Sequence, residues 1–290
     1  KRNKNNYLLS GKSFDATTAL NKIFDESDSK KFLLFSNNFK TNINIKIDKF
    51  YLDNEYFIRS VNGNMSLKNN EIEKMDITSF FDKNKKLTLT INNNLNEKIT
   101  TIYSDYARPL VKKYKFIKGF QEGSLDFYSV KKNNNTKGRL KIYDFKLNEL
   151  PVLTKILTLA SLQGIADLLS GDGIRFSDFE MSYSTNGKLM TIHEIYAIGP
   201  AISILMDGYV ETSKLVSLSG TLVPATTINK AIGSIPIIGD ILVGKKVGEG
   251  VFGVSFKIKG PPKKLKTSVN PIKTLTPRFI TRTLEEIKKN

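Results

Sequence analysis

The sequence predicts a mainly β fold, built on an antiparallel sheet with one apolar face and one polar face. Apolar and polar residues alternate in three separate stretches, whose apolar members are Ile43, Ile45 and Ile47, then Leu87, Leu89 and Ile91, then Val254, Phe256 and Ile258. Successive side chains of a strand point to opposite faces of its sheet, so this period of two gathers the apolar side chains on one face.

Turn signals between these stretches support the same fold. A glycine followed by alternating residues recurs at Gly63, Gly123, Gly138 and Gly187. The spacing is too uneven for a solenoid repeat, and it predicts a meander in which each strand pairs with the next. The strands after the second and third of these glycines add four apolar candidates, Leu125, Phe127, Leu140 and Ile142.

Helices are predicted at a few positions only. Residues 151–169 begin with proline and are apolar on nearly every side, residues 225–243 contain two short apolar segments, and residues 277–289 are amphipathic. A further short helix is expected to begin after Ser13. The stretch 151–169 carries charged residues and is shorter than a bilayer requires, so no membrane-spanning segment is expected within this chain.

Composition excludes several kinds of chemistry. The chain has 290 residues, of which 40% are hydrophobic, which suffices for one or two packed domains. It has no cysteine, which excludes disulfides, thiolate metal sites and a cysteine nucleophile, and its single histidine excludes chemistry that needs two. The net charge of +17 is spread along the chain and fits either an anionic partner or a codon bias toward Lys and Asn.

Two glycine motifs resemble nucleotide-binding loops without meeting their requirements. Residues 239–246 nearly match a P-loop, but Lys246 stands where a hydroxyl should hold magnesium. Residues 248–253 match the dinucleotide pattern, but a strand follows them instead of a helix. A tight turn with close backbone packing explains these glycines better, so no nucleotide cofactor is expected.

Other reactive groups leave alternatives open. His193 lies within a strand pattern with no nucleophile elbow in the chain, while Asp172, Asp178 and Glu180 could supply a pair of catalytic carboxylates. Residues 112–118 alternate lysine with aromatic side chains, as a nucleic-acid platform would, but a solvated strand face explains them equally well. No nucleic-acid partner and no metal is expected.

A series of motifs runs in order through the second part of the chain. The main ones are 138–145, Leu150-Pro151, 160–171, 173–176, Gly199-Pro200-Ala201, 220–224, 235–239, 248–252, Gly260-Pro261, Val269-Asn270-Pro271 and Leu275-Thr276-Pro277. In this order they resemble the AsmA-like C-terminal region of the YhdP group of Gram-negative bacteria, over about residues 119–285. Before residue 119 the resemblance is weaker and lacks the family's Asp-Ala-Gly step.

The resemblance implies a bridge-like lipid transport protein. Such proteins have a transmembrane anchor in the inner membrane and a long twisted β-sheet that forms an open apolar groove across the periplasm, along which phospholipid acyl chains move toward the outer membrane. This chain would then comprise a β-rich groove segment, residues 1–118, and the AsmA-like C-terminal region, residues 119–290, near the outer membrane or its proteins. The family carries no catalytic residues and no cofactor, so an enzyme is not expected.

The candidate site residues follow from this resemblance. The alternating apolar residues named above would line the groove, because burying an acyl chain contributes about 0.8 kcal/mol per CH₂. Apolar residues of the predicted helices would cap its end, namely Ile156, Leu157, Leu162, Ile165, Ile237, Ile238 and Ile241. A scaffold or modulator of outer-membrane assembly that transports no ligand remains the alternative.

Overall fold

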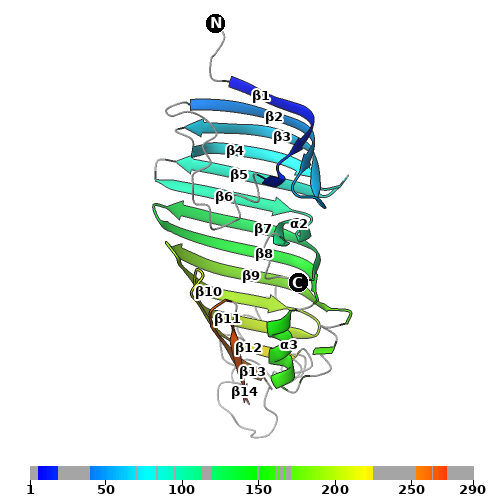
Figure 1. Ribbon diagram of the computed structural model, residues 1–290, viewed down its shortest axis with the longest axis vertical. Coiled ribbons are helices and arrows are strands. Elements are labelled where there is room, and N and C mark those ends of the chain that lie inside the picture. The colour runs from blue at the N-terminus through cyan, green and yellow to red at the C-terminus, as the bar shows by residue number, and fades with distance from the viewer. Residues whose placement is uncertain are drawn as a thin grey trace, which may run out of the picture. The chain divides into compact units, whose positions relative to one another are not determined.

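A computed structural model describes residues 6–18, 40–68, 71–82, 84–94, 96–112, 119–148, 150–160, 162, 166–167, 171–224, 253–262 and 264–272. It confirms a mainly β fold with few helices. The strands form one 14-stranded sheet, in which the order of strands follows the order of the sequence from β1 to β14. Figure 1 shows this order clearly for β1 to β6, which lie side by side.

The described strands and helices have the following bounds. The strands are β1 (Asn6–Asp15), β2 (Lys40–Tyr51), β3 (Phe57–Lys68), β4 (Glu71–Phe80), β5 (Lys86–Asn94), β6 (Glu97–Ser104), β7 (Phe120–Lys132), β8 (Asn135–Leu147), β9 (Ile174–Asn186), β10 (Leu189–Ile198), β11 (Ile202–Glu211), β12 (Leu215–Pro224), β13 (Gly253–Gly260) and β14 (Lys266–Ile272). The helices are α2 (Arg108–Val111) and α3 (Pro151–Leu159).

The direction of the first strand differs from the predicted antiparallel pattern. β2 to β7 pair antiparallel, as do β9 to β14, but β1 runs parallel to β2, with Asn6 opposite Asn42 and Phe14 opposite Phe50. Parallel neighbours need a crossover of a dozen or more residues, and the chain from residue 16 to residue 39 is long enough for one.

The chain divides into two compact units. The first comprises Lys1–Phe116 and Glu122–Ile142, and the second comprises Ile117–Gln121 and Tyr143–Asn290. The first unit holds β1 to β6 with most of β7 and part of β8, and the second holds α3 and β9 to β14.

Hydrophobic residues of the first unit gather near the turns that follow β2 and β4. Ile47, Leu52, Ile58, Val61, Phe81 and Leu87 form a buried cluster there. Tyr56, Tyr106 and Leu110 pack against it, and the last belongs to α2. Pro109 begins α2 well because its missing N–H would be unsatisfied in a first helical turn, and it is buried. The core of this unit therefore lies toward one end of its strands.

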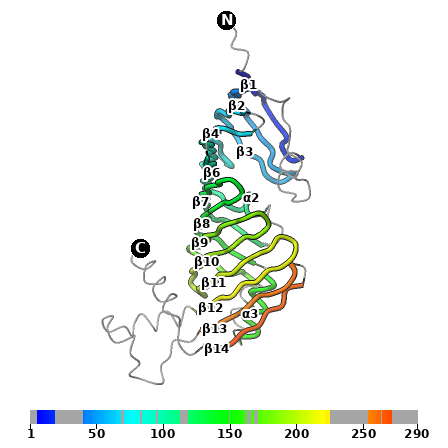
Figure 2. Tube along the Cα trace, turned by 90° about the vertical axis from the view of Figure 1, so that its left-hand side faces the viewer, coloured from blue at the N-terminus to red at the C-terminus, as the bar shows by residue number. Residues whose placement is uncertain are grey.

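The second unit is organised around aromatic rings and around α3. Phe145 stacks between Phe120 and Phe176, with ring centroids 5.3 Å apart on each side, and meets Phe179 edge to face at 6.3 Å. The helix α3 buries Leu153, Ile156 and Leu157, and it contacts β14 (Figure 2). Aromatic stacking across neighbouring strands and one covered helix face therefore supply much of this core.

Two predicted helix boundaries are wrong. The helix predicted over 151–169 is interrupted: α3 ends at Leu159, where Ala160 turns and the Leu162 N–H donates to the Leu157 carbonyl, and helical residues recur at 166–167, with the Ala166 N–H donating to the Leu162 carbonyl at 3.1 Å. The helix expected after Ser13 does not begin there, since β1 continues to Asp15, whose side chain accepts the Thr17 N–H. The helices predicted over 225–243 and 277–289 lie outside the described residues.

Candidate apolar binding face

The strands β2 to β7 of the first unit carry one continuous row of paired residues through the middle of the sheet. Ile45 pairs with Gly63, Gly63 with Ile77 and Ile77 with Leu89; the row continues through Ile102 to Phe127. Residues directly opposite each other on neighbouring strands share a face of the sheet. Four of the five side chains in this row are thus aliphatic and the last is aromatic, while glycine contributes none.

Two flanking rows extend the same face. On one side Ile43, Met65, Met75, Ile91, Thr100 and Ser129 follow one another across the six strands. On the other side Ile47 pairs with Val61, and Leu87, Ser104 and Leu125 pair in turn. We call these three rows the apolar face. All eight groove candidates from β2, β5 and β7 lie on it, as the alternation predicted.

The side chains in the middle row are half-buried, whereas many of those in the flanking rows are buried. Ile43, Ile47, Leu87, Ile91 and Leu125 are buried. Ile45, Leu89 and Phe127 of the middle row are half-buried. Their partial exposure leaves apolar area that an added molecule could cover, and covering such area is favourable in proportion to its extent.

The reverse face of these strands is mainly polar from β2 to β5. Asn44 pairs with Asn64, and the row continues through Asp76, Thr90 and Thr101. Lys46 and Asn62 begin a second polar row, and the Asn62 side chain donates to the Ser60 carbonyl at 2.8 Å. On β2 to β5 an apolar ligand would therefore find only one of the two faces favourable, whereas β6 and β7 add Ile99, Val130 and Tyr128 to the reverse face.

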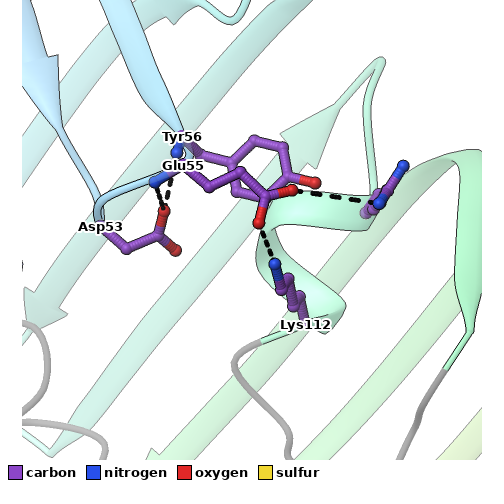
Figure 3. Close-up of polar contacts among 5 residues, drawn as sticks. Asp53, Glu55, Tyr56 and Lys112 are labelled. Atoms are coloured by element: carbon purple, nitrogen blue, oxygen red, sulfur yellow. Dashed lines mark hydrogen bonds and ion pairs between the residues drawn. The ribbon is translucent and has the colours of Figure 1, made fainter.

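A polar contact holds α2 to the turn between β2 and β3, close to the buried cluster of this unit. The Glu55 carboxylate accepts a hydrogen bond from the Lys112 ammonium and lies 3.9 Å from the Arg108 guanidinium (Figure 3). Asp53 shapes the turn, since its side chain accepts the backbone N–H groups of Glu55 and Tyr56 at 2.9 and 2.7 Å. We call Glu55, Arg108 and Lys112 the turn–helix contact.

Electrostatics at this contact follow from its geometry. The hydrogen bond from Lys112 is the main cause that holds the pKa of Glu55 below its ordinary value. Burial, followed by the hydrogen bond with Glu55, raises the pKa of the Tyr56 hydroxyl well above 10. The Lys112 ammonium also lies 5.4 Å from the centre of the Tyr56 ring, within the range of a cation–π interaction. Sequence reasoning missed this contact, because its partners are far apart in the chain.

Replacing Glu55 with glutamine should loosen α2 and leave the sheet intact. An exposed ion pair contributes little to global stability, so the unfolding midpoint should stay nearly unchanged while the amides of α2 exchange hydrogen faster. A carboxyl group with a lowered pKa stabilises the folded state above its ordinary pKa and loses this effect as the pH falls. In the unchanged protein the protection of the α2 amides, relative to their intrinsic exchange rate at each pH, should therefore also fall on acidification. Hydrogen exchange measured at the amides of α2 checks both predictions. Equal protection of these amides in Glu55→Gln and in the unchanged chain would contradict the first.

The candidates from the second unit lie on a comparable face. Val254 pairs with Leu222, Phe256 with Gly220 and Ile258 with Leu218, and each row continues onto β11. All three are buried. The ring of Phe256 takes the space over Gly220, where an added Cβ would lie 2.7 Å from its Cζ. These side chains are therefore packed within the core of their own unit.

The remaining candidates divide between described and undescribed residues. Ile142 of β8 is buried and Leu140 half-buried. Ile156 and Leu157 are buried on α3, whereas Leu162 is half-buried beyond its end. Four candidates lie outside the described residues, namely Ile165, Ile237, Ile238 and Ile241. So do residues 239–252, which hold nearly all of the two glycine motifs, and residues 113–118 of the stretch that alternates lysine with aromatic side chains.

His193 and the three carboxylates considered for catalysis do not line one depression. His193 contacts the Ser184 hydroxyl at 2.9 Å and borders a depression of about 490 Å³ with Asp207 and Tyr209, but none of the three carboxylates proposed from the sequence lines it. Asp172 is exposed in the turn before β9, where Gly173 has a φ of 86°. No cluster of three or more potential metal ligands occurs in the part of the chain that the structure describes.

No helix in the described part of the chain has the length and hydrophobicity to cross a membrane.

Searches against protein-family models, curated proteins and solved structures found no match for this chain.

Proposed function

We propose that this chain is a lipid-binding segment of a bridge-like envelope protein and that the apolar face is the floor of its groove. The observation that carries the proposal is the middle row of the apolar face. It presents half-buried apolar side chains on five of the six strands from β2 to β7, with Gly63 on β3, while the reverse face is mainly polar on β2 to β5. An apolar surface that is only partly covered is typical of a site for an apolar ligand.

The dimensions of this row suit an acyl chain. Neighbouring strands lie about 4.8 Å apart, so the five steps from β2 to β7 extend about 24 Å. The hydrocarbon core of a bilayer is about 30 Å thick, so the tails of one leaflet need about 15 Å. One acyl chain could therefore lie along the row, and each buried CH₂ would contribute about 0.8 kcal/mol.

Transport along such a surface requires similar affinity at successive positions. Isoleucine recurs along the row, leucine and phenylalanine occur once each, and area burial has no preferred direction. From β4 to β6 a tail that moves by one strand exchanges one aliphatic contact for another. This repetition supports movement of an acyl chain along the row. The resemblance to the AsmA-like region implies that the cargo is phospholipid moving between inner and outer membranes, and that the chain lies in the periplasm as part of a protein anchored in the inner membrane.

A charge in the middle row tests the proposal. Ile45→Asp and Leu89→Asp should each reduce binding of a fluorescent phospholipid at least tenfold, because tail contact would require burying a carboxylate that has no partner. Matched controls on the reverse face are Asn44→Asp and Asn92→Asp, which are exposed and lie on the same two strands. They should bind lipid as the unchanged chain does.

The measurement is retention of labelled phospholipid after delivery from vesicles, with circular dichroism to confirm folding. Folded Ile45→Asp and Leu89→Asp variants that retain lipid as well as their controls would contradict the proposal. So would an unchanged chain that retains no lipid.

The edge strand supports a second candidate, a scaffold in the cell envelope. All residues of β1 are exposed, including Tyr7 at 54% and Leu8 at 68%. Only one of its two edges pairs with a strand among the described residues, and an open edge favours addition of a strand from another protein. Photo-crosslinkers at β1 that capture a protein, together with none at the middle row that captures lipid, would favour the scaffold.

A further inference from the structure

One end of the apolar face carries two lysines in place of apolar residues. Lys98 on β6 pairs directly with Lys131 on β7, in the same continuous register that pairs Ile102 with Phe127. Both lysines therefore project from the apolar face, two rows beyond its middle row. Sequence alternation could not show this, because it does not place one strand against the next.

The pairing is unfavourable for the protein alone. The Cβ atoms of directly opposite residues lie about 5 Å apart, and like charges at this distance destabilise a sheet. Burial, followed by the charge of Lys131, lowers the pKa of Lys98. Glu71 acts on Lys98 in the opposite sense, but neither ammonium forms an ion pair within the described ranges. Two cations are thus held together with no anion between them.

Lys132, the residue after Lys131, shows that a lysine at this end of the strands can have a carboxylate partner. Lys132 follows Lys131 on the reverse face, and its ammonium lies 3.7 Å from the Glu97 carboxylate. Lys132 on the reverse face therefore has an anionic partner, whereas no ion pair is formed by the two lysines on the apolar face within the described ranges.

The chemistry along β6 and β7 changes in steps. Ile102 and Phe127 are apolar, Thr100 and Ser129 carry hydroxyl groups, and the lysine pair follows. Each step of two residues advances about 6.6 Å along the strands. A phospholipid changes in the same order, from acyl tail through ester-linked glycerol to phosphate.

We propose that Lys98 and Lys131 bind the phosphate of an anionic phospholipid whose tails lie on the apolar face. This rests on the proposed function and adds the headgroup class and the orientation of the lipid. The phosphate lies at the lysine end of β6 and β7, and from Ile102 and Phe127 the tails follow the middle row across the strands toward β2. Cationic groups bind phosphate oxygens through charge-assisted hydrogen bonds, and the bound phosphate relieves the repulsion between the two ammonium groups.

The test compares phosphatidylglycerol with phosphatidylcholine carrying the same acyl chains, each delivered from vesicles of a single lipid. The unchanged chain should retain phosphatidylglycerol about three to ten times better than phosphatidylcholine, because two partly exposed charge contacts contribute this much to binding. The double variant Lys98→Gln/Lys131→Gln should lose this preference and keep its retention of phosphatidylcholine. The control Lys46→Gln/Lys132→Gln removes two charges from the reverse face and should keep the preference.

The outcomes separate the two proposals. A chain that retains neither lipid contradicts the proposed function and this site with it. Retention of both lipids to the same extent, a preference that survives in the double variant, or a preference lost equally in the control overturns the site alone. Inorganic phosphate at the concentration of the lipid phosphorus should leave the preference unchanged; its loss would show that the lysines bind free phosphate, which overturns the lipid assignment.

Discussion

Replacing Phe145 with alanine is expected to lower the free energy of unfolding of the second unit by about 3 to 5 kcal/mol, the usual cost of removing a buried aromatic ring. Phe145 is 2% exposed and stacks with a ring on each side. Its loss removes both stacking contacts and the edge-to-face contact with Phe179, and it leaves a cavity that three strands would have to close.

Urea unfolding followed by circular dichroism measures this change. Tyr209→Ala is a suitable control because it removes an aromatic ring that is 39% exposed in the same unit, and it should change stability by much less. Phe145→Leu should fall between the two because it keeps most of the buried apolar area. Equal effects of Phe145→Ala and Tyr209→Ala would show that the stacked rings contribute little to this unit.

Replacing Gly63 with valine is expected to destabilise the first unit by about 1 to 3 kcal/mol or more, as overpacking does. Gly63 lies in the middle row between Ile45 and Ile77. An added Cβ would lie 1.9 Å from the Asp76 carbonyl oxygen and 2.8 Å from Cδ1 of Ile77. The backbone oxygen cannot move aside as a side chain would, so β3 and β4 must separate.

Asn64→Val provides the control for this substitution. Asn64 is the next residue on β3, is exposed and belongs to the polar row, where valine suits a strand and meets no such obstacle. It should leave the unfolding midpoint within about 0.5 kcal/mol of the unchanged chain. A Gly63→Val variant as stable as Asn64→Val would show that the strands accommodate the added side chain.

The strands were predictable because alternation is a local signal. The pattern at Ile43, Ile45 and Ile47 and the pattern at Leu87, Leu89 and Ile91 are each contained in a few residues, and both proved to mark one face of the sheet. The parallel direction of β1 was not predictable, since alternation has the same period in parallel and antiparallel strands. The end of α3 was missed because its apolar run continues beyond Leu159, where the chain turns.

Features that depend on pairing between distant residues could not be derived from the sequence. Glu55 meets Lys112 across 57 positions, and the pairing of Lys98 with Lys131 exists only in the register of β6 and β7. In the sequence each of these lysines is one among many. The structure distinguishes them by the face on which they lie and by the presence or absence of a carboxylate nearby.

The agreement between strand order and sequence order has a consequence for how the molecule can grow. Each described strand bonds only to the strands before and after it in the chain, so stability accumulates as a sum of nearest-neighbour terms, as in a linear repeat. Folding can begin at any hairpin and extend outward, since the contacts it needs are close in sequence. Insertion or deletion of a whole hairpin would change the length of the sheet without disturbing the pairing of the rest.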